Sequence, residues 1–433
     1  MSTPVFFSGR KILLAKRQTS CIFNSKMPII TSLLDTDLYK FTMAQAALHR
    51  APNTDTVYAF KCRSDVDLRP FENEIREEIY ALENLQFTGE ELAYLKTRRF
   101  LTADFIEFLS ILRLTPRTDV EITAGPENLD ITIRGTWHMK IWYEIYILAI
   151  VAEVYHRNTS PTPDYAGGLR RLHEKCDKII ANVAGSGKEF RLIEFGTRRR
   201  FSKEWQHEVT KVLVERLGQE PNLHLFGTSN VEMAMRYGLR PIGTMAHELF
   251  QAAQGMNVRL EDSQKHALEM WTQEFRGDLG IALTDIFGFD AFLADFDLFF
   301  AKLFDGARHD SGCPFAWTEK LLAHYRNLNI DARSKAAVYS DGLNIEKALA
   351  LWAQFEGQIR TSFGIGTDMT CDIPGVKPLQ IVIKMVECNG APVAKLSDSE
   401  GKEMCRDAQY VAYLRTRIAH KIQAAKDKGY ATH

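Results

Sequence analysis

The sequence predicts an α/β protein in which a parallel barrel carries a second, α+β domain built from both ends of the chain. From about residue 190, short apolar strands alternate with helices, and each strand runs into a cluster of small or polar residues. This repeated order of strand, polar turn and helix is typical of a parallel barrel. Segments rich in β-forming residues also lie before and after that region, which indicates a second sheet.

Size and composition support two domains and exclude some functions. A chain of 433 residues is too long for one ordinary core. Its 54 Lys and Arg residues nearly balance 55 Asp and Glu residues, so we expect no nucleic-acid or membrane partner. The longest apolar stretch, 141–154, is shorter than the roughly 20 residues of a membrane span and contains Glu144 and Glu153. Seven scattered cysteines without metal-ligand spacing indicate reduced thiols.

Residues 1–26 differ from the rest because they contain several basic residues and no acidic one. We expect them to be a leader without fixed structure, or sequence ahead of an alternative start at Met27. A mitochondrial presequence has a similar composition and is the alternative. The expected location is the cytoplasm, with the nucleus and the mitochondrion as further options.

The predicted domains are 27–135 together with 370–433, and the barrel over 136–369. In the first domain, 35–50 has the spacing of a helix with Asp35 or Thr36 as its N-cap. A strand is expected at 57–62, and a largely buried helix at 141–157 opens the barrel region. Two hairpins are expected, at 120–123 with 129–133 and at 379–387 with 392–396, before a basic helical tail.

Seven predicted barrel strands each precede a polar or glycine-rich cluster. The strands and their clusters are 190–195 before 196–200, 223–226 before 227–230, 241–242 before 243–247, 281–283 before 284–285, a strand ending at 304 before 305–312, 338–339 before 340–342, and 361–363 before 364–367. In a parallel barrel the loops after the strands share one face, so these clusters should meet there.

Three clusters could bind phosphate. Arg198, Arg199 and Arg200 follow a strand directly and could hold a polyphosphate, although a solvated charge run is the alternative. The segment 364–367 could offer backbone N–H groups to phosphate, or be a structural turn. The segment 308–312 places a cation and a carboxylate before a helix; these could hold pyrophosphate, Mg²⁺ or a ribose diol, or form an ordinary N-cap.

Histidine chemistry is a further possibility at the predicted barrel face. His247 begins a predicted helix, where a neutral imidazole near ATP could accept a phosphoryl group, although a lone histidine is more often structural. Asp285, at the next strand end, could fix the tautomer of that imidazole. Asp341, at a later strand end, could bind a ribose or a metal or cap a helix.

Taken together, these segments resemble those of one enzyme family. The matching runs are 32–40, 195–202, 227–230, 243–248, 280–285, 308–312, 362–367 with 371–374, and 386–398. From about residue 27 to the end, the chain resembles nicotinate phosphoribosyltransferases of the bacterial and fungal type. The resemblance implies an irregular α/β barrel of the type II phosphoribosyltransferases. It also implies transfer of phosphoribosyl from phosphoribosyl pyrophosphate to nicotinate, with ATP cleaved alongside and Mg²⁺ as cofactor.

The resemblance also implies roles for individual residues. His247 matches the histidine that ATP phosphorylates, and Tyr39 and Phe195 match the aromatic pair around the pyridine ring. In relatives this tyrosine can come from a neighbouring subunit, which implies a possible homodimer with a shared active site. The residues that match phosphate, pyrophosphate or ribose contacts are Arg63, Arg198, Arg308, Asp310, Asp341, Gly366 and Thr367, with Lys395 near the same pocket.

Ser229 is the predicted determinant of the substrate. Nicotinamide-using relatives have Asp at the matching position, whereas a hydroxyl can donate to the carboxylate of nicotinate. The alternatives are a nicotinamide-specific transferase and a barrel that binds sugar phosphates without turnover. A metal-dependent hydrolase is disfavoured because no His and carboxylate set has ligand spacing in the sequence. Cys313 stands where the family usually has a second Asp, which puts one Mg²⁺ contact in doubt; the metal ligands stay unassigned.

Overall fold

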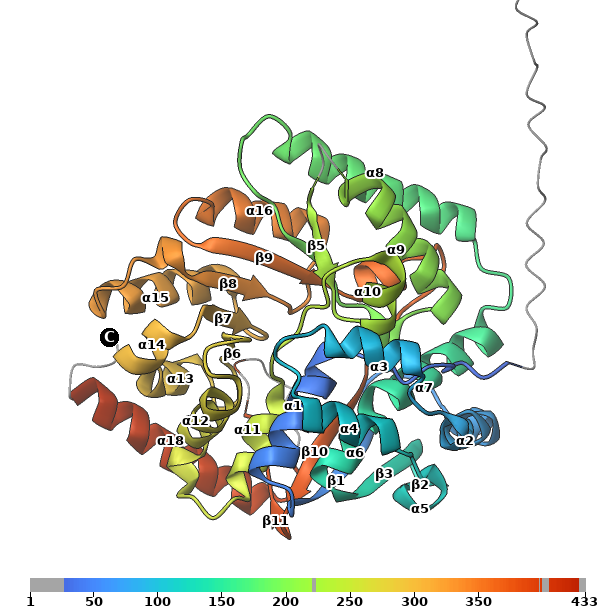
Figure 1. Ribbon diagram of the computed structural model, residues 1–433, viewed down its shortest axis with the longest axis horizontal. Helices are drawn as coiled ribbons and strands as arrows, with labels where there is room; N and C mark the ends of the chain where they lie inside the picture. The colour runs from blue at the N-terminus through green and yellow to red at the C-terminus, as the bar shows by residue number, and fades with distance from the viewer. Residues whose placement is uncertain (1–26, 220–222, 397, 399–404, 428–433) are drawn as a thin grey trace, which may run out of the picture.

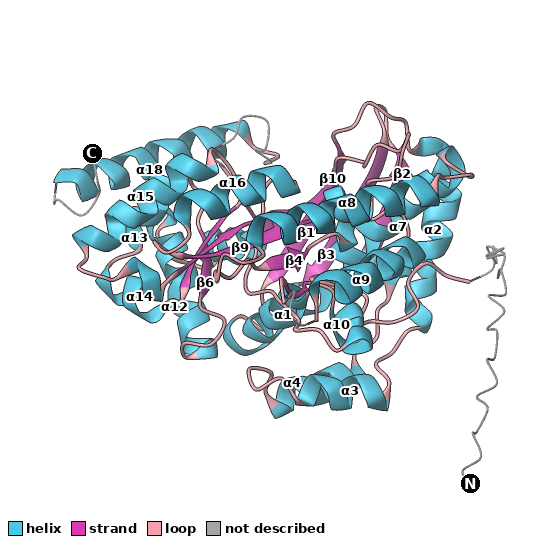
Figure 2. Cartoon of the chain, turned by 90° about the horizontal axis from the view of Figure 1, so that it is seen from above, coloured by secondary structure: helices cyan, strands magenta, loops and turns pink. Residues whose placement is uncertain are grey.

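The computed structural model describes residues 27–219, 223–396, 398 and 405–427. The predictions for the leader, 1–26, lie outside the described residues. Two sheets lie side by side with helices packed around them (Figure 1 and Figure 2). One cluster of buried apolar side chains runs through both, from Tyr58 in one sheet to Phe363 in the other. The predicted α/β class is confirmed, whereas the boundaries of the two domains stay a prediction.

The antiparallel sheet joins segments from both ends of the chain, in the order β11-β10-β1-β3-β2. Its strands are β1 (Asp55–Cys62), β2 (Val120–Ala124), β3 (Leu129–Thr136), β10 (Ile381–Cys388) and β11 (Ala391–Pro392). The predicted hairpin of 120–123 with 129–133 is confirmed, and the second forms at the expected turn but with a shorter second strand, 391–392 instead of 392–396. Asn389 and Gly390 connect β10 to β11 with φ values of 51° and 76°, the left-handed conformation that a tight hairpin turn requires.

The parallel sheet has the order β5-β4-β9-β8-β7-β6. Its strands are β4 (Leu192–Glu194), β5 (Leu225–Thr228), β6 (Ile281–Leu283), β7 (Gly306–His309), β8 (Ala336–Tyr339) and β9 (Arg360–Ile365). The predicted strand at 241–242 forms only one bridge, from Pro241 to Thr228 at the edge of β5. Nearby, the hydroxyl of Thr244 donates to the carbonyl of Ile281 in β6 over 2.8 Å. The segment 241–244 therefore spans the two outer strands, as expected of an irregular barrel.

The position of β7 along the chain differs from the prediction. The sequence places the strand before residue 305 and a polar loop after it, but the strand is Gly306–His309. A Cβ atom on Gly306 would lie 2.0 Å from the carbonyl oxygen of Ala336, so only glycine permits this close pairing with β8. Arg308 consequently projects from the strand itself rather than from the loop after it.

Helices surround the two sheets (Figure 2). Their bounds are α1 (Leu38–Arg50), α2 (Glu72–Ala81), α3 (Gly89–Lys96), α4 (Ala103–Ile111), α5 (Pro116–Asp119), α6 (Trp137–Lys140), α7 (Tyr143–Thr159), α8 (Tyr165–Val183), α9 (Lys203–Leu217), α10 (Val231–Tyr237), α11 (His247–Gln254), α12 (Ser263–Phe275), α13 (Phe289–Asp295), α14 (Leu298–Leu303), α15 (Pro314–Asn327), α16 (Ile345–Phe355), α17 (Thr367–Thr370) and α18 (Ala408–Asp427). The buried helix predicted at 141–157 is confirmed by α7. None of the helices in the described part of the chain is long and apolar enough to cross a membrane.

The start of α1 was assigned wrongly from the sequence. Asp37, rather than Asp35 or Thr36, is the N-cap residue. Asp35 is fully buried and forms a two-pronged ion pair with Arg200, at 2.7 and 2.8 Å. A carboxylate that neutralises a buried guanidinium is not available to cap a helix, because leaving that cation unpaired would cost several kcal/mol.

Candidate active site

A cleft lies where the antiparallel sheet faces the ends of the parallel strands. Its empty space is about 1080 Å³ including open solvent. Residues from the N-terminal part of α1, from α7, β1 and β10 line one side, and residues after β4, β5, β8 and β9 line the other. The convergence predicted for the strand-end clusters is therefore present.

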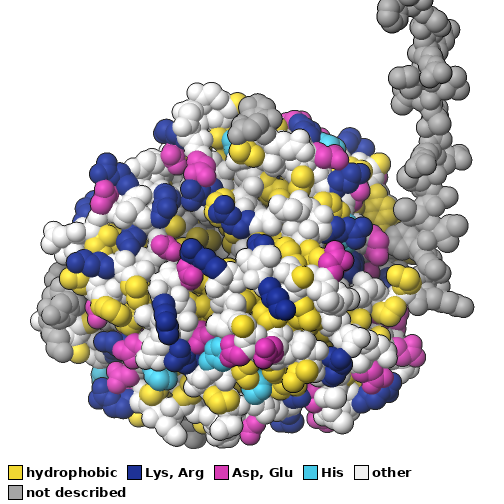
Figure 3. Space-filling view, in the orientation of Figure 1, with side chains coloured by type: hydrophobic (Ala, Val, Ile, Leu, Met, Phe, Trp, Pro, Cys, Tyr) yellow, Lys and Arg dark blue, Asp and Glu magenta, His cyan; other side chains and the backbone are white. Residues whose placement is uncertain are grey.

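Three cations in this cleft form no salt bridge in the part of the chain that the structure describes. Within the described ranges, the side chains of Arg198, Arg308 and Lys384 make no hydrogen bond or ion pair, and all three line the cleft. The Nε atom of Arg308 is buried without a partner. On the outer face shown in Figure 3, basic and acidic side chains are interspersed. The cleft, rather than the surface as a whole, is therefore suited to an anion with several charges.

The three adjacent arginines have different environments. Arg198 and Arg199 line the cleft, and Arg199 also donates to Gln380 over 2.7 Å. Arg200 is instead buried against Asp35, so the prediction of a ligand-binding role does not hold for it. The short 3₁₀ turn Thr197–Arg199 explains the difference, since successive side chains on such a turn point about 120° apart.

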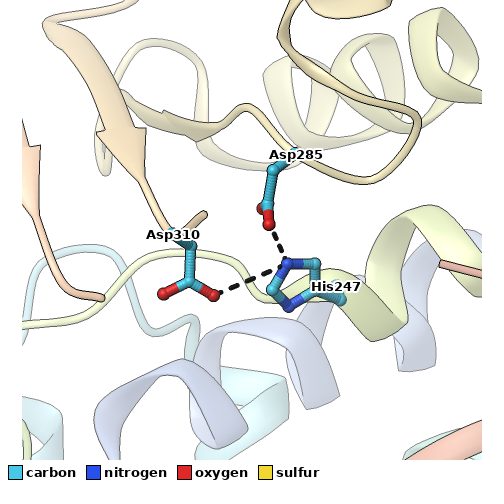
Figure 4. Close-up of side chains that lie close together, drawn as sticks. All are labelled: His247, Asp285 and Asp310. Atoms are coloured by element: carbon cyan, nitrogen blue, oxygen red, sulfur yellow. Dashed lines mark hydrogen bonds and ion pairs between the residues drawn. The ribbon is translucent and has the colours of Figure 1, made fainter. Parts of the chain in front are cut away.

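His247 begins α11 and lies beside two carboxylates, of which Asp285 is hydrogen-bonded to it (Figure 4). Its Nε2 atom lies 2.8 Å from Oδ1 of Asp285 and 3.6 Å from Oδ2 of Asp310. The other oxygen of Asp285 accepts from Ser311 and pairs with Lys395, both at 2.7 Å. Because Asp285 is the acceptor, Nε2 carries the proton and Nδ1 keeps its lone pair.

The electrostatics keep this imidazole neutral and its partners charged. Burial, reinforced by Lys395, lowers the pKa of His247 to about 4. Burial alone would raise the pKa of Asp285, but contacts with His247 and Lys395 outweigh it and hold that pKa well below its usual range. Burial and Asp285 likewise oppose ionisation of Asp310, yet His247 and Arg308 lower its pKa to about 2. Near neutral pH the cluster therefore pairs a neutral histidine with two carboxylates.

The fold also creates a possible metal site that sequence spacing does not show. One ligand atom each from His247, Asp285 and Asp310 lies within 4.8 Å of the others. However, both oxygens of Asp285 are already engaged by His247, Lys395 and Ser311. Asp310, whose side chain is 27% exposed at the cleft, is the member suited to a hard cation such as Mg²⁺, which prefers carboxylate and ligand oxygens.

Both aromatic residues expected from the sequence line the same cleft, within a single chain. Tyr39, on α1, and Phe195, after β4, both line it. A Cβ atom on Gly364 would come within 2.4 Å of the Phe195 ring, so glycine allows this ring to lie against β9. No second subunit is needed to bring Tyr39 to this cleft, and the predicted homodimer stays a prediction.

Not every predicted residue lines the cleft. Ser229, Gly366 and Thr367 do, together with the residues already described. Lys395 does not line it: it is buried behind the cleft with its ammonium on Asp285, so it lies near the pocket as expected, and a direct contact with a ligand stays a prediction. Arg63, after β1, and Asp341, between the lining residues Ser340 and Gly342, are also not among the lining side chains.

Several residues at the cleft or directly behind it were missed from the sequence. Lys40 is fully buried and bridges Glu144, at 2.6 Å, to Glu248. Glu248 also accepts from Tyr58 over 2.9 Å, and both carboxylates line the cleft. Glu144 could have been found, because it interrupts an apolar helix. Lys384 gave no signal, since a lysine in a strand ordinarily points to solvent.

Comparisons with known proteins agree with this geometry. Residues 190–421 match the profile described as Nicotinate phosphoribosyltransferase (NAPRTase) family, and residues 34–152 match its N-terminal domain. Together these ranges cover most of the chain. The chain belongs to the nicotinate phosphoribosyltransferase family.

Individual relatives of this family match over nearly their whole length. The chain is 52% identical to the nicotinate phosphoribosyltransferase of Acidovorax sp. (strain JS42), over 89% of this chain and 98% of the relative. The Bordetella pertussis enzyme of the same name is also 52% identical, over 89% and 94%. Among solved structures, the nicotinate phosphoribosyltransferase from Vibrio cholerae has a TM-score of 0.87 at 39% identity, covering 93% of this chain and 98% of that one. A putative nicotinate phosphoribosyltransferase from Saccharomyces cerevisiae has a TM-score of 0.84 at 33% identity, with 91% and 99% covered.

The family assignment confirms the resemblance read from the sequence and the expectation of an enzyme. It does not by itself assign the ATP step, the metal or the role of any side chain. Cys313, the departure from the family pattern, is exposed and is the N-cap residue of α15 without a side-chain cap bond.

Proposed function

We propose that this chain transfers the phosphoribosyl group of phosphoribosyl pyrophosphate to nicotinate, the first step of NAD salvage from nicotinate, and couples this to ATP cleavage through phosphorylated His247. The ring nitrogen of nicotinate forms a bond to the anomeric carbon as the bond from that carbon to pyrophosphate breaks. The observation that carries the proposal is that Arg198, Arg308 and Lys384, three cations that form no salt bridge within the described residues, share a cleft with His247, which is bonded to Asp285.

The cleft residues divide this work. Tyr39 and Phe195 stack on the pyridine ring and aim its nitrogen, which lowers the entropic barrier to attack. Arg308 and Lys384 stabilise the charge that develops on departing pyrophosphate, helped by the backbone at Gly366 and Thr367. Roles for Arg63 and Asp341 are supported only by the match to the family, because their side chains do not line the cleft.

Asp310 would hold the ribose hydroxyls and Mg²⁺. Its ionised carboxylate faces the cleft, and Mg²⁺ is usually bound by one or two carboxylates together with phosphate oxygens of the substrate. When bound, Mg²⁺ supplies charge neutralisation for pyrophosphate. The side chain of Asp310 is itself oriented by the hydroxyl of Ser340, which donates to its Oδ1 over 2.8 Å.

His247 accepts the phosphoryl group at Nδ1. The Nδ1–phosphorus bond forms as the bond between the γ-phosphorus and the bridging oxygen of ATP breaks, and ADP leaves with that oxygen. Asp285 holds the proton on Nε2 and stabilises the positive charge that the ring gains on phosphorylation. Lys395 and Ser311 keep Asp285 ionised and fixed, so they are positioning residues.

Label transfer and product formation test this proposal. With nicotinate, sugar donor and Mg²⁺, we expect product by chromatography and faster formation with ATP. His247→Ala should lose ³²P uptake from γ-labelled ATP and the ATP stimulation. His324→Ala is the matched control, because His324 is another buried histidine, bonded to the carbonyl of Phe296 and not part of the cleft. Full label uptake by the His247 variant would refute the phosphohistidine.

One observation favours a second candidate, the transferase that uses nicotinamide. The hydroxyl of Ser229 donates to Asp37 over 2.7 Å, so its proton is not available for a carboxylate in this arrangement. A serine oxygen with free lone pairs would suit the amide of nicotinamide. Comparing kcat/KM for the two bases decides, and a clear preference for nicotinamide would overturn the nicotinate assignment.

A further inference from the structure

Asp37, to which no role has been assigned, forms a buried pair with Ser229 at the cleft. Asp37 is the N-cap residue of α1, yet its side chain makes no capping hydrogen bond. It turns instead to Ser229, whose hydroxyl lies 2.7 Å from its Oδ1 atom. Asp37 is 3% exposed and Ser229 is 5% exposed, and both line the cleft beside Tyr39 and Phe195. The pair therefore faces the position proposed for the pyridine ring.

The neighbouring hydrogen bonds fix the direction of the second contact to Asp37. The hydroxyl of Thr197 is a second polar neighbour of Asp37 and lowers its pKa. The oxygen of Thr197 accepts from the amide groups of Asn230 and Gln206, at 3.2 Å each. The Asn230 amide is oriented in turn, because its carbonyl accepts from the backbone of Met233. Thr197 therefore has only its own proton to offer to Asp37, which leaves Ser229 as the contact whose direction can reverse.

The protonation state of Asp37 decides that direction. When Asp37 is ionised, it can only accept, so Ser229 donates to it and presents lone pairs to the cleft. When Asp37 is protonated, it can donate to Ser229, whose hydroxyl is then free to donate into the cleft. The first arrangement matches the N–H groups of an amide, and the second matches a carboxylate. An unmatched polar group in a buried site costs about 1–3 kcal/mol, so the two states should select different bases.

We propose that Asp37 is a specificity-determining residue, whose proton turns the Ser229 hydroxyl toward the ligand and so selects nicotinate over nicotinamide. This inference rests on the proposed function. It also requires that binding of nicotinate be accompanied by uptake of one proton at Asp37, because the ligand carboxylate brings a second negative charge to the pair.

The groups around Asp37 are consistent with a proton being bound there. Burial raises its pKa, and Glu144 from α7 adds to the rise. Arg198 and the hydroxyls of Ser229 and Thr197 oppose it, but the net shift is upward. The remaining titratable neighbours are Tyr39, next along α1, and Glu194 at the end of β4. A bound carboxylate would raise the pKa further, since a like charge disfavours ionisation.

The test is the pH dependence of the preference between the two bases. At saturating sugar donor and ATP, kcat/KM for nicotinate and the competition constant of nicotinamide are measured between about pH 6 and pH 9, where free nicotinate stays ionised. For the unmodified enzyme, the preference for nicotinate should fall up to about tenfold per pH unit above the pKa of Asp37, since one proton is required. The ratio cancels groups that act on both bases alike.

Two variants and one control make the test specific. In Asp37→Asn the side-chain amide can donate a hydrogen bond to Ser229 at every pH. This variant should therefore retain the preference for nicotinate, with no pH dependence. Ser229→Ala should lose the part of the preference that the hydroxyl supplies while retaining Asp37, so its pH dependence should be weaker than that of the unmodified enzyme and reflect only repulsion between Asp37 and the ligand carboxylate. Glu153→Gln is the control, because Glu153 is a buried carboxylate with a pKa raised by burial to about 7, outside the cleft; it should behave as the unmodified enzyme.

A preference that is constant over this range in the unmodified enzyme would overturn the inference. An Asp37→Asn enzyme that keeps the original slope would do the same. Failure of the proposed function is recognised separately, because the unmodified enzyme would then form no nicotinate mononucleotide at any pH.

Discussion

Replacing Asp285 by Asn isolates the contribution of the carboxylate to phosphorylation of His247. The carboxylate accepts three hydrogen bonds, from His247 at 2.8 Å and from Lys395 and Ser311 at 2.7 Å. An Asn side chain keeps the shape but replaces one acceptor oxygen by an N–H₂ group. If the oxygen stays on Lys395 and Ser311, the amide faces Nε2 and forces the ring into the tautomer that carries its proton on Nδ1.

The expected magnitude follows from the lost interaction. A hydrogen bond between a charged acceptor and the imidazole contributes about 1.5–3 kcal/mol, which corresponds to a rate loss of about 10- to 150-fold. The ring also loses the anion that stabilises its positive charge after phosphorylation, so we expect the upper part of that range. The free energy of unfolding should fall by about 3 kcal/mol, because Lys395 is left buried without a counter-ion.

Single-turnover transfer of ³²P from γ-labelled ATP measures the rate, and urea denaturation measures the stability. Asp295→Asn is the matched control. Asp295 is 5% exposed, pairs with Lys421 at 2.5 Å and accepts from Gln264 at 2.7 Å, and it lies outside the cleft. It should lose similar stability without loss of phosphorylation rate. A rate for Asp285→Asn within about threefold of the unmodified enzyme would refute the tautomer argument.

Three further outcomes follow from the cleft geometry. Arg200→Met should lower the free energy of unfolding by about 3–5 kcal/mol in urea denaturation. Arg198→Met should leave that free energy unchanged and raise the KM for the sugar donor about tenfold or more. Equal stability losses in the two variants would contradict this division. Gly364→Ala should raise KM for nicotinate because the new methyl group displaces Phe195, and an unchanged KM would place the base elsewhere. Burial lowers the pKa of Lys384 to about 8, so kcat/KM for the sugar donor should fall as pH rises through 8, and Lys384→Met should remove that decline.

The alternation of strands and polar turns could be predicted from the sequence because it depends on the residue pattern of short segments. The hairpin at Asn389-Gly390 and the buried helix α7 depend on turn chemistry and on apolar runs, which are properties of short segments. The strand β7 was misplaced because Gly306 and Arg308 have the composition of a loop. Only the close approach of β8, which no local pattern reveals, makes glycine suitable there.

The site was less predictable because side-chain partners come from distant segments. Lys395 carries the same charge whether it binds a phosphate or Asp285, and only the fold brings that carboxylate within 2.7 Å. Adjacent Arg198 and Arg200 are equivalent in the sequence but differ in environment, since a 3₁₀ turn directs one to the cleft and the other to Asp35. Charge and position along a strand therefore locate the active face, but do not say which cations face the ligand.

The same limit applies to the argument from Ser229. A hydroxyl both donates and accepts, so its presence opposite a ligand does not determine which group it recognises. The deciding partner is Asp37, which the sequence presents as an ordinary helix N-cap and which the fold turns to Ser229 instead. Because a carboxylate at 2.7 Å claims the serine proton, selectivity for an acidic base depends on whether that carboxylate is itself protonated. Recognition at this cleft is thus a property of the Asp37–Ser229 pair and its proton, and replacing Ser229 alone should not convert one base preference cleanly into the other.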